Sequence, residues 1–319
     1  MTNNNLLITV EHLSRHYGPI QAVSHVNFEL NRGEVLGFLG PNGAGKSTTM
    51  QMITGNLAPS TGKISICGID LLDEPKMAKA EIGYLPEQPP VYRDFTVDEY
   101  LDFCARINRI SKDKIARAID QAKQRCGLTD VSKRLIANLS KGYQQRVGIA
   151  QAIIHSPAIV VLDEPTVGLD PIQIREIRGL IRELASEHGV ILSTHILPEV
   201  QMTCDRVQII NKGKLVYSDD IGNLDQRMRA TTLLLELRTP PTETELAKLP
   251  GVSQCEALGH NRFRLHHDTE QNPAEQIAEQ AVKAGWGLLE LHSERKTLEQ
   301  VFVEITSSEQ LSVEEGHAA

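Results

Sequence analysis

The run from Gly40 to Thr48 reads GPNGAGKST and fits the spacing G-x-x-x-x-G-K-[ST], in which each fixed position suits phosphate chemistry. Glycines at three of its positions let the backbone bend, so that its N–H groups can point at phosphate oxygens. Lys46 can place a positive charge against the β- and γ-phosphates, and Ser47 can offer a hydroxyl to Mg²⁺. The predicted phosphate-binding residues are Gly40, Pro41, Asn42, Gly43, Ala44, Gly45, Lys46, Ser47 and Thr48.

The segments on either side of this loop predict the strand–loop–helix context that the motif requires. Glu34–Leu39 is an apolar run typical of a buried strand. Lys46–Ile53 predicts a helix, whose N-terminus would attract anions because its first N–H groups lack partners within the helix. The loop is therefore expected to bind a nucleotide.

A second apolar run, Ile159–Pro165, ends in two adjacent carboxylates. An apolar run of this length predicts a strand that is buried on both faces. Ligands of open α/β sheets bind beyond the carboxyl ends of the strands, so Asp163 should lie near the phosphates and help to hold Mg²⁺. Glu164 should face the water that attacks the γ-phosphate, as a base or as a water-positioning group.

Between these runs lies Leu139–Arg146, where Ser140 is a good N-cap for a helix that continues towards His155. The segment Ser-Lys-Gly-Tyr-Gln resembles the signature motif of ABC transporter ATPases, with Ser140, Gly142 and Gln144 kept. The Lys and Tyr between them depart from the commonest form and are familiar in an export-type branch of that family. The resemblance implies that the start of this helix in one subunit caps the γ-phosphate held by the other, which the partial positive charge of a helix N-terminus favours.

Further matches to the family follow in the expected order along the chain. Tyr17 corresponds to the aromatic residue that stacks on adenine, and Gln88 to the glutamine that contacts Mg²⁺ or water and senses the membrane partner. Asp170 corresponds to the aspartate near the dimer interface. His195, which follows the apolar strand Val190–Leu192, corresponds to the switch histidine that contacts the γ-phosphate.

The resemblance covers about the first 220 residues and implies an α/β fold, a P-loop NTPase of the ABC ATPase type. It further implies an ATP hydrolase that uses ATP and Mg²⁺, acts as a homodimer and powers export through a permease on a separate chain. The wording of the motifs is similar to gliding-motility-associated and multidrug export ATPases. Such a subunit would be cytoplasmic and peripheral on the inner face of the membrane. Two alternatives remain open: a soluble ABC ATPase of translation or DNA repair, and a non-hydrolysing regulatory partner.

Composition agrees with these expectations. The chain has 319 residues, an apolar fraction of 40% and a formal net charge of −8, so binding to nucleic acid is not favoured. No stretch approaches eighteen uninterrupted apolar residues, and Met1–Val10 lacks the basic start and apolar core of a signal peptide. The five cysteines are scattered without a C-x-x-C pair, which is typical of reduced thiols.

The pattern of elements predicts an ABC ATPase domain over residues 1–220, with a helical subdomain at about 89–138. Within the subdomain, Thr96 and Glu99 have capping-box spacing and Ser111–Cys126 predicts a helix. Residues 221–306 predict a small α+β domain, and residues 307–319 a polar, disordered tail. The small domain's expected elements are strands at Thr231–Leu237, Val252–Leu258, Arg262–Leu265 and Leu288–Leu291, and helices at Asn272–Ala284 and Thr297–Ile305.

Overall fold

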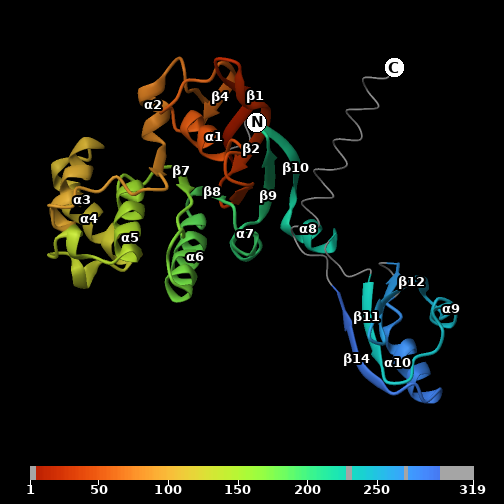
Figure 1. Cartoon of the computed structure of the whole chain (residues 1–319). Helices are drawn as coiled ribbons and strands as arrows, with labels where there is room; N and C mark the ends of the chain where they lie inside the picture. Colours follow the sequence, from red (N-terminus) through yellow and green to blue (C-terminus); the bar gives the residue numbers. More distant parts are fainter. Residues whose placement is uncertain (1–4, 228–231, 269–271, 295–319) are drawn as a thin grey trace, which may run out of the picture. The chain divides into compact units, whose positions relative to one another are not determined.

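The computed structural model describes residues 5–227, 232–268 and 272–294. The chain divides into two compact units, Met1–Ile221 and Gly222–Ala319 (Figure 1). The helix expected at Thr297–Ile305 and the tail expected at 307–319 lie outside the described residues. Both units combine helices and sheets, which confirms the α/β fold class of the first.

The central sheet of the first unit consists, in spatial order, of β10 (Lys214–Asp220), β9 (Arg206–Asn211), β3 (Val35–Leu39), β8 (Gly189–Thr194), β7 (Ile159–Asp163) and β6 (Ile82–Leu85). The pairings from β9 to β6 are parallel, and β10 pairs antiparallel with β9. Every residue of β3, β7 and β8 is buried, as expected for strands covered on both faces. The strands expected before the phosphate loop, before the paired carboxylates and before His195 are therefore confirmed.

A second, antiparallel sheet consists of β2 (Ile20–Asn31), β1 (Leu6–Tyr17), β4 (Thr61–Ile66) and β5 (Ile69–Asp70). The long β1–β2 ribbon has irregular register around Val10 to Leu13, where His12 adopts a left-handed φ of 50°. Its amide N–H donates to Asn27 Oδ1 at 2.7 Å instead of continuing the ladder. Such bulges bend the strand and increase the local twist of a ribbon.

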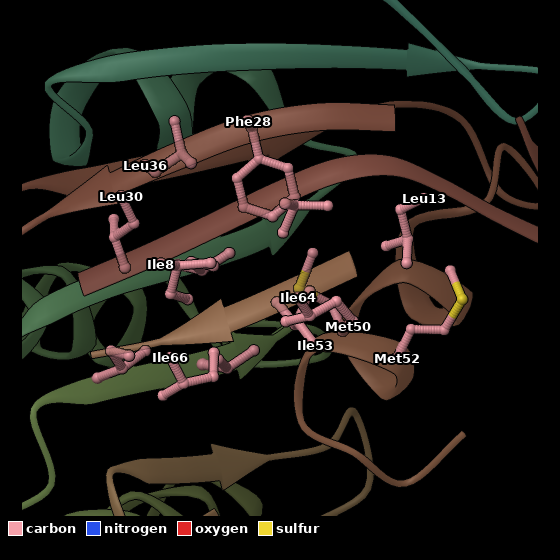
Figure 2. Close-up of a cluster of buried hydrophobic side chains, with 14 of the residues drawn as sticks. Ile8, Leu13, Phe28, Leu30, Leu36, Met50, Met52, Ile53, Ile64 and Ile66 are labelled. Carbon is pink, nitrogen blue, oxygen red and sulfur yellow. The ribbon is translucent and has the colours of Figure 1, made fainter. Parts of the chain in front are cut away.

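The main hydrophobic core of the first unit draws side chains from both sheets and from α1 (Lys46–Ile53). Figure 2 shows Met50, Met52 and Ile53 of α1 facing side chains of the antiparallel strands. Phe28 and Phe38 pack edge-to-face with ring centroids 5.0 Å apart, which is a geometry that aromatic pairs prefer. This core holds α1 in place, and the first residues of α1 are the end of the phosphate loop. The other labelled side chains in Figure 2 are Ile8, Leu13, Leu30, Leu36, Ile64 and Ile66.

In Figure 1 the helices α3 (Val97–Ile107) and α4 (Lys112–Cys126), which lie within the range predicted for a helical subdomain, form a group with α5 (Lys141–Ile153). Thr96 and Glu99 form the expected capping box at the start of α3: Thr96 Oγ1 accepts from Glu99 N, and Glu99 Oε2 accepts from Thr96 N. The helix after Ser111 ends at Gly127, whose φ is +64°. The helical elements of the first unit are α1, α2 (Pro75–Ala80), α3 (Val97–Ile107), α4 (Lys112–Cys126), η1 (Thr129–Val131), η2 (Ile136–Asn138), α5 (Lys141–Ile153), α6 (Pro171–Ala185) and α7 (Leu197–Thr203); α8 (Ile221–Arg227) begins at its boundary.

The second unit has an antiparallel sheet with its own core, made of β12 (Val252–Gly259), β13 (Arg262–His267), β11 (Thr232–Leu237) and β14 (Leu288–Ser293), together with α9 (Glu243–Leu246) and α10 (Ala274–Lys283). Alternate residues of β11 are buried, and they pack with Ile277 and Ala281 of α10. The strands and the helix expected within 232–294 are confirmed. The short helix α9 was not predicted; a capping box between Thr242 and Glu245 starts it.

We expect Leu30→Ala to lower the free energy of unfolding of the first unit by about 2–5 kcal/mol, because it leaves a cavity in a fully buried part of the core. The matched control is Leu72→Ala, at a leucine that is 53% exposed, where a change within about 0.5 kcal/mol is expected. Urea unfolding followed by far-ultraviolet circular dichroism measures both. Equal losses in the two variants would contradict the position of this core.

Candidate nucleotide-binding and catalytic site

Three neighbouring parallel strands bring the phosphate loop, the Asp163–Glu164 pair and His195 to one edge of the central sheet. Leu39 of β3 pairs with Thr194 of β8, and Asp163 of β7 pairs with Ser193 of β8. The residues that follow these strand ends are therefore brought together, although His195 follows Thr48, the last residue of the phosphate loop, by 147 positions. The carboxyl edge of an open parallel sheet is where ligands of this fold class bind.

The phosphate loop leaves β3 and wraps around the side chain of Lys46. Gly43 and Gly45 have φ values of +80° and +108°, which a residue with a Cβ rarely adopts. Lys46 is only 5% exposed, and its Nζ donates to the carbonyl oxygens of Gly40 at 2.8 Å and of Pro41 at 3.3 Å. Lys46 is the first residue of α1, so the loop holds a buried positive charge at the start of this helix.

Glu164 follows the last residue of β7 and has a φ of 50°, an uncommon value for a residue other than glycine. Its backbone N–H donates to Ser193 O at 2.9 Å, so the strained turn is anchored to β8. The carboxylate is 3.4 Å from Lys46 Nζ and accepts from His195 Nδ1 at 2.9–3.0 Å. Strained backbone of this kind persists only where surrounding contacts enforce it, and it is concentrated at functional sites.

Asp163 is 2% exposed, and burial raises the pKa of its carboxyl. The neighbouring hydroxyls of Ser193 and Ser47 act in the opposite direction on that pKa. Among the described residues, Asp163 Oδ1 has no hydrogen-bond partner. A buried carboxylate oxygen beside a serine hydroxyl is a donor set that fits Mg²⁺, which prefers oxygen ligands.

A cavity of about 370 Å³ opens beside the phosphate loop. Among the predicted residues, those that line it are Asn42, Gly43, Gly45, Lys46, Ser47, Thr48, Glu164 and His195. Ala22, Glu87 and Val167 also line the cavity and were not predicted. Only the identity of Glu87, which precedes the predicted Gln88, offered a signal in the sequence; Ala22 and Val167 reach the cavity through chain folding alone.

Two predicted residues lie at the periphery of this arrangement. Tyr17 ends β1, is 44% exposed and has the guanidinium carbon of Arg15 at 4.7 Å from its ring centroid. Gln88 is exposed after the end of β6 and is not among the residues that line the cavity. Their assignment to adenine stacking and to Mg²⁺ or water remains a prediction.

The residues of the signature-like segment do not line the cavity of their own chain. Ser140 caps α5, because its side chain accepts from the N–H of Tyr143. Gln144 Nε2 donates to the carbonyl oxygens of Ile136 and Leu139, and so braces the chain just before the cap. The segment is therefore a capped helix start that does not contribute to the cavity beside its own phosphate loop.

Asp170 has a structural role that the sequence analysis did not consider. Its Oδ1 accepts from Ile172 N at 3.0 Å and from Gln173 N at 2.9 Å, which caps α6. The signal was present in the sequence, since Asp170 precedes Pro171 and an acidic N-cap followed by proline at the first helical position is a common helix start. The cap fixes the loop that connects Glu164 to α6.

Comparison with known proteins agrees with this geometry. The family profile described as "ABC transporter" matches residues 23–167. The bacitracin transport ATP-binding protein BcrA of Bacillus licheniformis is 40% identical over 225 residues, which cover 70% of this chain and 72% of that protein. The linearmycin resistance ATP-binding protein LnrL of Bacillus subtilis (strain 168) is 29% identical over 306 residues, covering 94% and 98%.

A solved structure of cbiO1 from Clostridium perfringens, described as part of the ABC transporter complex cbiONQ, is similar in fold with a TM-score of 0.64. It is 30% identical and covers 69% of this chain and 91% of that one. The chain therefore belongs to the family of ABC transporter ATP-binding proteins, whose members generally bind and hydrolyse ATP. Among the helices within the described ranges, none has the length and apolar character needed to cross a bilayer.

We expect Gly40→Ala to weaken ATP binding by about tenfold or more, because the added Cβ would clash with the carbonyl oxygen of Ile210 in β9 and displace the phosphate loop. The matched control is Gly179→Ala in α6, where a Cβ meets nothing within 4 Å. Titration with a fluorescent ATP analogue measures both affinities. Unchanged affinity in Gly40→Ala would contradict the close packing of this loop on β9.

Proposed function

We propose that this chain is the ATP-binding and ATP-hydrolysing subunit of an exporter, and that it acts as a homodimer on a permease encoded by a separate chain. The observation that carries the catalytic part is the meeting of Lys46, Glu164 and His195 at one edge of the sheet, with distances of 3.4 Å and 2.9 Å to the shared carboxylate. This arrangement combines a phosphate-binding cation with a carboxylate and an imidazole able to orient water.

The proposed binding roles concern the phosphates first. The N–H groups of the loop and the ammonium of Lys46 would face the β- and γ-phosphates of ATP, beside the cavity that Gly43, Lys46 and Ser47 line. Ser47 and Asp163 would hold Mg²⁺, and Gln88 would contribute from the segment after β6. Mg²⁺ supplies charge neutralisation on the phosphate oxygens, which together with Lys46 is the largest catalytic contribution. Tyr17 stacks on adenine, since a flat aromatic ring suits any base.

Glu164 acts on the attacking water, and His195 completes its surroundings. The carboxylate is 6% exposed and already has two polar neighbours, so its position is defined before ATP binds. A His195 ring that carries a proton on both nitrogens could donate from Nδ1 to Glu164 and from Nε2 to an oxygen of the γ-phosphate, which can only accept. Preorganisation of this kind lowers the barrier because the groups need not reorient during the reaction.

The second nucleotide contact comes from another copy of the chain. Ser140, Gly142 and Gln144 do not line their own cavity, yet they form a well-capped helix start with a positive end. In a head-to-tail dimer this end would cap the γ-phosphate bound by the partner, and Asp170 would lie near the interface. Closure of the dimer on ATP and its reopening after hydrolysis would then drive transport.

We propose that the permease docks on an aromatic patch of the helical subdomain. The patch is formed by Tyr92, Phe95 and Phe103. Tyr92 and Phe95 are 52% and 36% exposed, and the three ring centroids lie 5.3–6.2 Å apart. Clustered exposed aromatic side chains mark protein interaction sites.

The names of the relatives BcrA and LnrL, which refer to bacitracin transport and linearmycin resistance, favour export as the direction of transport.

We expect Glu164→Gln to bind ATP with near-parental affinity, to lose at least about 99% of ATP hydrolysis, and to accumulate as an ATP-bound dimer. The amide keeps the size of the side chain but cannot act as a base. Hydrolysis is measured by phosphate release and the dimer by light scattering with Mg²⁺ and ATP. A variant that hydrolyses ATP at the parental rate would remove Glu164 from the mechanism.

Two comparison variants make this experiment specific. Lys46→Ala should lose hydrolysis and also fail to form the ATP-dependent dimer, because the phosphate-binding cation is gone. Lys112→Ala, at an exposed lysine of α4, should match the parental protein in both measurements. Absence of ATP hydrolysis by the parental protein itself, in the presence of its membrane partner, would favour the non-hydrolysing regulatory alternative.

We expect the double variant Tyr92→Ala/Phe95→Ala to lose at least about 90% of the polytopic membrane protein that co-purifies with the parental chain in detergent. The patch would lose its two exposed rings while the nucleotide site stays intact. Met77→Ala, at a residue of α2 that is 57% exposed, is the control and should retain the partner. Ribosomes or DNA in place of a membrane protein would instead favour a soluble ABC ATPase.

A further inference from the structure

Glu199 is a buried carboxylate that the proposed catalytic mechanism does not use. It lies in α7, directly after the segment that carries His195, and is 1% exposed. Burial of a charged carboxylate is unfavourable unless hydrogen bonds or opposite charges compensate it. Glu199 must therefore be compensated by its neighbours, and those neighbours indicate its role beside the site.

Each oxygen of the Glu199 carboxylate accepts a hydrogen bond from a threonine. Thr166 Oγ1 donates to Oε1 at 2.5 Å, and Thr194 Oγ1 donates to Oε2 at 2.9 Å. Bonds from hydroxyls to carboxylates are short and about twice as strong as bonds between neutral groups. The guanidinium of Arg178 in α6 lies 3.9 Å from Oε1 and adds a positive charge.

The two threonines belong to the two segments that supply the catalytic groups. Thr166 lies two positions after Glu164, and Thr194 immediately precedes His195. The carboxylate thus bridges loops that are about 30 residues apart in sequence. These contacts lie outside the nucleotide cavity, because neither Thr166 nor Glu199 lines it.

The hydroxyl of Thr194 has a defined direction, which makes the bridge specific. Its Oγ1 accepts from the N–H of Ile196 at 3.1 Å while it donates to Glu199. The hydroxyl therefore ties the residues on both sides of His195 to one carboxylate. A glutamine at position 199 could accept from one threonine only. Its amide N–H would face the other hydroxyl, which now donates to the carboxylate and would lose the acceptor for its own proton.

We propose that Glu199 is a positioning residue, which holds the turn of Glu164 and the loop of His195 in one arrangement so that these two side chains meet. The inference rests on the proposed function in so far as it concerns catalysis. A displacement of about 1 Å in a catalytic group can reduce a rate by about 100-fold, so a bridge of this kind has a measurable effect even though it touches neither substrate nor metal.

The catalytic test compares kcat and KM for ATP in variants of the full-length chain. Glu199→Gln and Thr194→Val should each lower kcat by about tenfold or more and change KM by less than about twofold, since the phosphate-binding groups stay in place. Thr194→Ser keeps the hydroxyl and should restore kcat to within about threefold of the parental value. A parental kcat in folded Thr194→Val would overturn the proposal.

Thr203→Val provides the matched control for loss of a buried hydroxyl. Thr203 lies in the same helix, is 1% exposed, and its Oγ1 has no hydrogen-bond partner within the described part of the chain. This variant should keep the parental kcat. If its kcat fell as far as that of Thr194→Val, the effect would reflect general destabilisation of α7, and the positioning role would be rejected.

Hydrogen–deuterium exchange without nucleotide separates this inference from the proposed function. In Glu199→Gln and in Thr194→Val, backbone amides of both 164–170 and 193–197 should exchange at least about fivefold faster, and Thr203→Val should leave both segments unchanged. This result with an inactive parental chain would reject the proposed hydrolysis and keep the bridge. Faster exchange confined to one segment, or in neither, would overturn the bridge whatever the activity.

Discussion

The parallel pairing of β3, β7 and β8 is the constraint on which the rest of the site depends. Because these strands run in one direction and are buried along their whole length, their carboxyl ends stop at one edge of the sheet. Gly40, Glu164 and His195 each follow one of these ends. A site assembled in this way inherits the rigidity of a close-packed core, which catalytic preorganisation requires.

The same edge brings together charged side chains, each of which would be unfavourable to bury without a partner. Lys46 is surrounded by carbonyl oxygens and by the carboxylate of Glu164, whereas Asp163 keeps one oxygen without a partner among the described residues. The left-handed backbone at Glu164 adds strain, and the hydrogen bond from its N–H to the carbonyl oxygen of Ser193 offsets part of that cost. Burial and strain here are consistent with a site that is completed by a charged ligand.

Local signals explain how far the sequence predicts this structure. The phosphate loop, the helix after it and the capping box at Thr96 depend on residues within a few positions of one another, and all three are found where expected. The bounds of β1 and β2 were not predicted, because bulges such as that at His12 interrupt the alternation of apolar and polar residues. The cap formed by Asp170 was overlooked although its signal is local.

The sequence by itself determined that the chain has a nucleotide-binding loop, because the phosphate loop has few other interpretations, and the segment from Ser140 to Gln144 carried the resemblance to ABC transporter ATPases. Only the tertiary structure decided which groups meet. The contact between Glu164 and His195 and the bridge through Glu199 join segments about 30 residues apart, and the register of β7 on β8 sets their distances. Neither local propensity nor spacing encodes that register, since it results from the packing of both sheet faces.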